Sequence, residues 1–109
     1  MNKLYRGSLE TIILKLLADR KEMYGYEITH IVKEMTAGEL KLTEGALYPA
    51  LHKLEAKGIL STETKSIGNR YRKYYSLTKK GKTEVPKILE EMEGYLSTIQ
   101  LILNPKLAN

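Results

Sequence analysis

The stretch of residues 43–78 constrains the fold more than any other part of the chain. Three leucines in it recur at spacings of four and three residues, which places them on one face of a helix. They are Leu47, Leu51 and Leu54. Gly58 suits the left-handed residue that follows a helix C-terminus, and Gly68-Asn69 favours the tight turn of a β-hairpin. A short helix followed by a hairpin is the layout of a winged helix-turn-helix.

The opposite face of this helix carries small, aromatic and basic side chains, and such a face fits a DNA groove. We expect Tyr48, His52 and Lys53 to point at bases or flanking phosphates, with Pro49 supplying shape and methyl contacts. Two alternatives stay open: Tyr48 also fits a half-buried position against the hairpin, and His52 fits an ordinary surface position. Thr43 fits the N-cap of this helix, and we include it among the candidate DNA-binding residues. Pro49 implies either a kink or a later helix start.

Charge is unevenly distributed along the chain. The net charge is +5 and the pI about 9.3, and residues 65–82 contain seven basic side chains and no acidic one. These are Lys65, Arg70, Arg72, Lys73, Lys79, Lys80 and Lys82. The rest of the chain is mildly acidic, with 11 basic residues against 13 acidic. The alternative is a charged surface that is simply solvated. The gathering of basic residues beside a predicted hairpin favours nucleic-acid contact instead. We expect Lys65, Arg70, Arg72 and Lys73 to meet phosphates or the minor groove.

Composition excludes several classes of protein. The chain has 109 residues and no cysteine, so disulfides, thiolate metal sites and cysteine nucleophiles are ruled out. The two histidines lie on different predicted helices without a carboxylate cluster, and no Gly-rich phosphate loop occurs. We therefore expect no enzyme, no cofactor and no metal. Neither a signal peptide nor an apolar run of about 18 residues is present, which predicts a soluble cytoplasmic protein.

Two further helices are expected before the central stretch. Ser8 fits the N-cap of a first helix that follows an arm of residues 1–7, and an apolar stripe then begins at Leu9. A second helix runs from about Tyr24 to Met35. Its early glycine, Gly25, permits either close approach of a phosphate, with Tyr24 beside it, or tight packing against a neighbour. Residues 40–42 alternate like a short strand.

A long helix is predicted after the hairpin, capped by Thr78. Gly81 and Pro86 weaken its first turns, which predicts a frayed start or a bend. Its apolar residues form a heptad seam broader than a small domain can cover: Val85, Leu89, Met92, Leu96, Ile99 and Leu103. The seam favours a two-fold dimer interface, and packing along the domain's own flank is the alternative.

The motifs together resemble the PadR-like transcriptional regulators, over about residues 7–81. The resemblance is carried by Gly7-Ser-Leu-Glu10, Ile13-Leu-Lys-Leu-Leu17, Tyr24-Gly-Tyr-Glu-Ile28, Gly45-Ala-Leu-Tyr-Pro49, Leu51, Leu54-Glu55, Gly58-Ile-Leu60, Arg72-Lys-Tyr-Tyr-Ser-Leu-Thr78 and Gly81. With one helix after the hairpin, the chain is similar to the compact subgroup. The resemblance implies a mainly α fold with a small β-hairpin: a winged helix-turn-helix in residues 1–78 and a dimerisation helix in residues 79–109, in one compact unit.

The resemblance also implies a cytoplasmic, homodimeric transcriptional repressor that binds an inverted-repeat operator in double-stranded DNA. Its dimer would be built by the first and last helices, here through Leu9, Ile13, Leu89, Met92, Leu96, Ile99 and Leu103. Family effectors include phenolic acids and hydrophobic drugs, and a cleft between long helices would hold one beside Tyr5, Leu9, Met92, Tyr95 and Ile99. The alternative function is a winged helix that docks proteins without specific DNA binding, which the basic hairpin disfavours.

Overall fold

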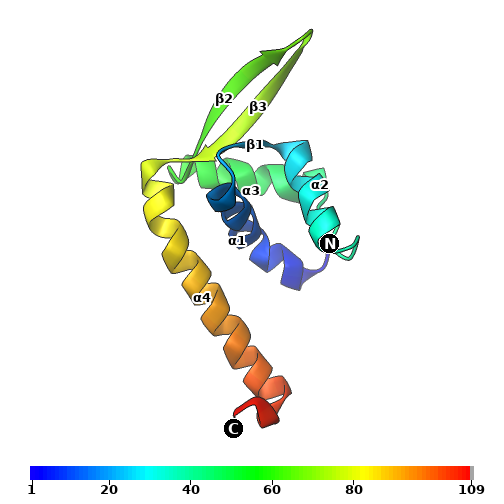
Figure 1. Ribbon diagram of the computed structural model, residues 1–109, viewed down its shortest axis with the longest axis vertical. Helices are drawn as coiled ribbons and strands as arrows, with labels where there is room; N and C mark the ends of the chain where they lie inside the picture. The colour runs from blue at the N-terminus through cyan, green and yellow to red at the C-terminus, as the bar shows by residue number, and fades with distance from the viewer. Residues whose placement is uncertain (109) are drawn as a thin grey trace.

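A computed structural model describes residues 1–108, and the side chains of residues 1–106. Asn109, the end of the predicted dimerisation segment, lies outside the described residues. In chain order the elements are α1 (Lys3–Asp19), β1 (Met23–Tyr24), α2 (Gly25–Met35), α3 (Glu44–Ala56), β2 (Leu60–Ile67), β3 (Arg70–Leu77), α4 (Lys79–Leu103) and the 3-10 turn η1 (Pro105–Ala108). Helices α1 to α3 form a body from which the hairpin and α4 project in opposite directions (Figure 1).

The core lies where α1, α2 and α3 meet the base of the hairpin. Its most deeply buried side chains include Ile13 of α1, Ile28 of α2 and both Leu47 and Leu51 of α3, each with no exposed surface. Tyr75 of β3 closes the core from the sheet side. Burying each such side chain contributes about 1.5–3 kcal/mol, so the body has a hydrophobic centre of its own.

Helix α3 forms as the sequence predicts. Thr43 is its N-cap, and the Thr43 side chain accepts a hydrogen bond from the Ala46 amide at 3.3 Å. The helix begins at Glu44, so the alternative of a later start is wrong, and Pro49 lies inside the helix. Gly58 ends it with φ of 76°, the left-handed conformation expected after a helix C-terminus.

The hairpin also follows the sequence. Its register runs from Leu60 opposite Leu77 to Ile67 opposite Arg70, leaving Gly68 and Asn69 as a two-residue turn. Of these two turn residues, only Gly68 has a positive φ, 61°, as in a type II′ turn. The backbone twist of such a turn matches the right-handed twist of the strands that it joins. The sequence prediction lacked the two-residue strand β1, which pairs with β3 and makes the order β1-β3-β2.

Two local predictions are wrong. Helix α1 begins at Lys3 rather than after Ser8, because the Asn2 side chain accepts from the Tyr5 amide at 3.0 Å and provides an earlier cap. Ser8 lies inside the helix, where its hydroxyl donates to the Leu4 carbonyl. Residues 40–42 are not a strand, although Leu40 and Leu42 are both buried, because none of the described strands pairs with them.

The start of α4 is fixed against the end of α3. Thr78 caps α4, accepting from the Gly81 amide at 3.0 Å, and its hydroxyl also lies 2.6 Å from the Gly58 carbonyl oxygen. A Cβ on Gly81 would lie 2.3 Å from the Ile59 carbonyl oxygen. These contacts leave no frayed start, so the first of the two expected alternatives is wrong, and α4 continues as one helix through Pro86.

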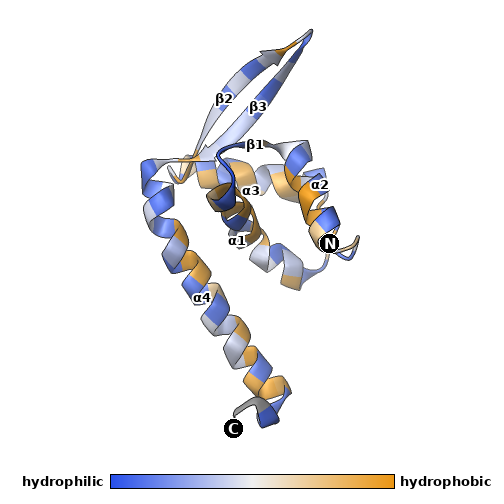
Figure 2. Cartoon of the chain, viewed as in Figure 1, coloured by the Kyte–Doolittle hydropathy of each residue, from blue (hydrophilic) through white to orange (hydrophobic). Residues whose placement is uncertain are grey.

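The far half of α4 extends away from the body, and apolar and polar residues alternate along it (Figure 2). Leu96 and Leu103 are exposed there, while Val85 near the start is buried. None of the described helices combines the length and apolar character needed to cross a bilayer.

Candidate nucleic-acid interface

The outward face of α3 consists of exposed residues, among them Gly45, Pro49 and His52. Tyr48 is half-buried on one edge of this face, packed on the first turn of α2. A Cβ at Gly25 would lie 2.4 Å from the Tyr48 hydroxyl oxygen. Of the two expectations for Gly25, tight packing against a neighbour is therefore the one observed, and it anchors α3 against α2.

A groove of about 330 Å³ joins α3, the start of α2 and the hairpin. It is lined by aromatic and basic side chains: Tyr24, Tyr26, Tyr48, His52, Tyr71, Arg72, Lys73 and Tyr75, with Gly25 at its floor. Basic groups attract phosphates, and tyrosine hydroxyls and rings add hydrogen bonds and contact area. The groove thus brings together five of the predicted DNA-contact residues, which lie far apart in the sequence: Tyr24, Tyr48, His52, Arg72 and Lys73.

Body residues hold several hairpin cations in place. Lys65 donates a hydrogen bond to Glu22 of the loop before β1, and the Arg72 guanidinium lies 4.4 Å from the Tyr24 ring centroid. The bond to Glu22 raises the pKa of the Lys65 amine, because a carboxylate partner favours the charged form. This bond therefore helps to orient the hairpin relative to the body.

Two more predicted contact residues also have carboxylate partners. Lys73 Nζ lies 3.7 Å from Glu55 Oε1 of α3. Lys53 Nζ lies 3.2 Å from Glu10 Oε2 of α1, on the edge of α3 away from the groove. Glu55 therefore belongs to the interface as a carboxylate that positions a hairpin cation.

The hairpin tip is exposed and combines a cation with apolar surface. Arg70 lies there beside exposed Ile67 and Tyr71. Sequence reasoning included Arg70 but missed Tyr71, and it missed Tyr26 on α2. Both tyrosines are exposed, so the available signal was a large aromatic on the polar face of its own element.

An apolar hollow of about 500 Å³ lies between α1, α2 and α4. Tyr5 and Met92, two of the predicted effector contacts, line it. Leu9, Tyr95 and Ile99 lie outside its lining. The remaining apolar walls are Ile12, Leu16, Val32, Met35, Leu40, Leu89 and Leu96, so the hollow is formed within one protomer and opens toward solvent.

Two residues predicted to lie in the dimer interface are buried within the protomer. Leu9 is 3% exposed and Ile13 is fully buried in the protomer's own core. Both belong to the buried core cluster with residues of α2, α3 and β3, and α1 contributes Ile12 to the lining of the hollow instead. We therefore correct the expectation and remove Leu9 and Ile13 from the proposed dimer contact.

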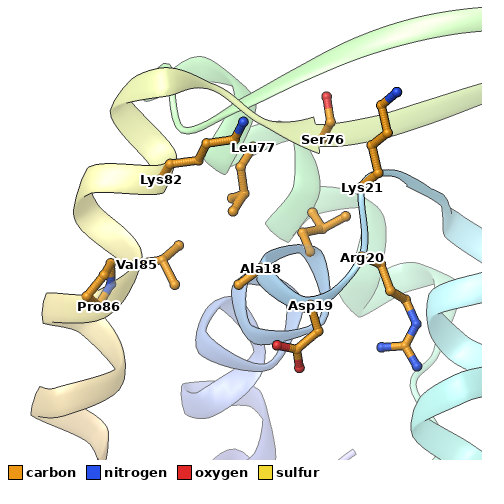
Figure 3. A pocket seen from close by; sticks show the side chains of 10 residues that line it. Ala18, Asp19, Arg20, Lys21, Ser76, Leu77, Lys82, Val85 and Pro86 are labelled. Carbon is orange, nitrogen blue, oxygen red and sulfur yellow. The ribbon is translucent and has the colours of Figure 1, made fainter.

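A second hollow, of about 550 Å³, lies where the end of α1, the end of β3 and the start of α4 meet (Figure 3). Leu77, Val85 and Pro86 supply apolar walls, and Ser76 and Lys82 lie at its rim. Within the part of the chain that the structure describes, no cluster of three or more potential metal ligands occurs.

Comparison with known proteins decides the family. The model of the transcriptional regulator PadR-like family matches residues 13–87, well over half of the chain. The chain belongs to the PadR-like family of transcriptional regulators. This membership confirms the winged-helix prediction and the regulatory, non-enzymatic class.

Relatives of this PadR-like protein agree with that placement. It is 34% identical over 95 residues to the transcriptional regulator Rv3488 of Mycobacterium tuberculosis, covering 84% of this chain and 85% of the relative. A transcriptional regulator from Clostridium thermocellum has the same fold, with a TM-score of 0.81, 30% identity and coverage of 92% and 94%. Bacillus subtilis PadR, solved in complex with operator DNA, matches with a TM-score of 0.66 and 34% identity, over 74% of this chain and 46% of that chain.

Proposed function

We propose that this PadR-like regulator binds a double-stranded DNA operator, with α3 in the major groove and the hairpin over the adjoining backbone and minor groove. The observation that carries this proposal is the groove in which the exposed face of α3 meets the basic, tyrosine-rich hairpin. The similarity to Bacillus subtilis PadR, which was solved with operator DNA, supports it.

The residues have different roles in this proposal. His52 and Pro49, exposed on α3, approach base edges, while Tyr48 and Thr43 at its flank approach the backbone. Arg70 at the exposed tip enters the minor groove. The remaining contacts are phosphate contacts that body residues orient beforehand: Tyr24, Lys53, Lys65, Arg72 and Lys73.

We further propose a homodimer formed through α4, with residues 1–78 as the DNA-binding part and residues 79–109 as the dimerisation part. The exposed seam residues Leu96 and Leu103, with half-buried Leu89, Met92 and Ile99, support it. A partner's α4 covers them and the apolar hollow together. The two α3 helices then lie roughly 34 Å apart, which predicts an inverted-repeat operator with half-sites one helical turn apart.

The regulatory mode follows as a proposal from this geometry. A dimer bound across a promoter acts as a cytoplasmic repressor by excluding polymerase. A small hydrophobic or phenolic effector fits the hollow lined by Tyr5 and Met92, because its walls are mainly apolar, with a few polar side chains such as Ser8 and Thr36. An effector there would lie beside Met92 and Leu96 of the proposed α4 interface, and would so alter how the partner packs and the spacing of the two α3 helices.

The test is selection of bound duplexes from fragmented genomic DNA at about 150 mM salt, where weak non-specific binding is suppressed. We expect an enriched inverted repeat. His52→Ala should reduce the preference for that repeat over a shuffled duplex by about tenfold, while Arg70→Ala should weaken both duplexes and make the salt dependence shallower. Recovery of no sequence above background would contradict the proposal and favour the protein-docking alternative.

A further inference from the structure

The solvent face of α2 carries a polar stripe of which only Tyr26 belongs to the groove between α3 and the hairpin. Tyr26, Thr29, His30 and Lys33 follow one another at spacings of three, one and three residues, opposite the buried face of the same helix. The Tyr26 ring is stacked with the His30 ring, with centroids 6.3 Å apart. The stripe is therefore an ordered surface with one cationic end.

The stripe continues into the segment before α3. With Lys41 and Leu42 it forms a hollow of about 210 Å³, in which Lys33 and Lys41 come from different segments. Tyr26 lines this hollow and also the groove between α3 and the hairpin. The two surfaces thus adjoin at Tyr26.

The charges of this stripe differ from those of the hairpin and α3. Lys65, Lys73 and Lys53 each have a glutamate partner within the protein. By contrast, Lys33 and Lys41 form no ion pair with the carboxylates of residues 1–106.

The carboxylates nearest along α2 are themselves engaged. Glu34 Oε1 lies 3.0 Å from His30 Nε2, and Glu27 accepts from the Tyr24 amide at 3.3 Å. A lysine without a carboxylate partner gives the full gain of counterion release when it meets a phosphate, because no internal pair must first be broken.

We infer that Lys33 and Lys41 form a second phosphate-binding surface, which holds the DNA backbone flanking each half-site. In a helix-turn-helix the first helix crosses the backbone while the second lies in the groove, and here α2 and α3 occupy those positions. Tyr26 and Thr29 add neutral contacts along the same strand. This surface contributes affinity without sequence preference, and it lengthens the footprint beyond the bases that α3 contacts.

The inference rests on the proposed function, and the experiment separates the two. Binding of the selected operator and of a shuffled duplex is titrated against salt for the wild type and the double variant Lys33→Gln/Lys41→Gln. We expect a slope of log affinity against log salt that is shallower by roughly four per dimer, since each lost phosphate contact removes about 0.9 and the dimer loses four. Both duplexes should weaken by the same factor, so the preference for the operator is retained.

Two matched variants serve as controls. Lys33→Arg/Lys41→Arg keeps the charges and should keep the wild-type slope, and Lys87→Gln removes an exposed lysine of α4, away from the groove, with no change. Hydroxyl-radical footprinting should show lost protection only at the outer backbone positions. An unchanged slope in the double glutamine variant, with wild-type binding intact, overturns this inference alone. Absence of salt-dependent DNA binding by the wild type overturns the proposed function and this inference with it.

Discussion

The two halves of α4 have the same apolar periodicity but different surroundings. At the start of the helix Gly81 and Val85 are buried against the hairpin base and α1, with Val85 only 4% exposed. Beyond the body the same seam continues through Leu96 and ends at Leu103, which is 78% exposed. A periodic seam therefore indicates that one helix face requires burial, but it does not indicate whether the same protomer or a partner provides the cover.

The largest expected effect is a loss of stability in the body that does not depend on the far half of α4. Ile13→Ala removes a fully buried side chain from the protomer core and should lower the free energy of unfolding by about 2–5 kcal/mol. Because the lost contacts lie within one chain, the loss should be the same at low and high protein concentration. Denaturant unfolding at two concentrations tests this. A loss that grows on dilution would mean that Ile13 also supports the interface.

Next in size is a charge placed on the exposed seam. Leu96→Glu should weaken dimerisation by about a hundredfold, since an unpaired carboxylate must be buried in an apolar contact. Sedimentation velocity over a concentration series measures this, and circular dichroism should show that the helical body is kept. Glu91→Gln, an exposed change on the same helix, is the control. A wild type that sediments as a monomer at every concentration would remove the basis of the comparison.

Two glycines of α4 allow the same comparison with one substitution. Gly81→Ala places a Cβ 2.3 Å from the Ile59 carbonyl oxygen and should destabilise by about 1–3 kcal/mol. A Cβ added by Gly94→Ala meets no neighbouring group within 4 Å. This substitution should raise the free energy of unfolding by about 0.5–1 kcal/mol, because alanine favours the helix. Thermal unfolding of both variants decides. Equal effects of the same sign would show that the α4 start is less closely packed than described.

The smallest effect is expected in alkaline solution and concerns the hairpin and its contacts with the body, not the far half of α4. Burial raises the pKa of Tyr75, and the Glu22 partner raises the pKa of Lys65. Groups whose folded pKa is raised stabilise fully below the unfolded value and lose that contribution as pH rises through the folded value. Stability should therefore fall above about pH 10.

Two variants test the assignment of this alkaline loss. Lys65→Arg keeps its charge above pH 10 and should reduce the loss, and Tyr75→Phe should remove the tyrosine part. Unfolding free energies measured between pH 8 and 11 provide the comparison. A wild-type stability that stays constant across this range would contradict it.

Local signals in the sequence predicted most of the fold. The leucine spacing, the caps Thr43 and Thr78, and the turn at Gly68 each depend on neighbouring residues, and the structure bears them out. Asn2 was missed as a cap because Ser8 is an equally good cap residue nearer the apolar stripe. The choice between them depends on how far the helix can extend over the body.

Features that depend on distant residues could not be predicted. The contact of Lys65 with Glu22 spans 43 residues, and β1 is too short to show an alternating pattern. The burial of Leu9 within the protomer follows from how α1 packs against the rest of the fold, which helical spacing alone does not specify. The hairpin residues proposed to contact DNA were identified by charge, and charge alone does not distinguish a paired lysine such as Lys73 from an unpaired one such as Lys33.

The contact between Gly81 and Ile59 has a consequence for DNA geometry. It joins the body to α4 without a flexible linker, so in the proposed dimer the distance and the rotation between the two α3 helices are set together. One additional base pair between half-sites moves them about 3.4 Å apart and turns one by about 34° around the duplex axis. A stiff dimer cannot follow both changes, so affinity should depend on helical phase as well as on sequence.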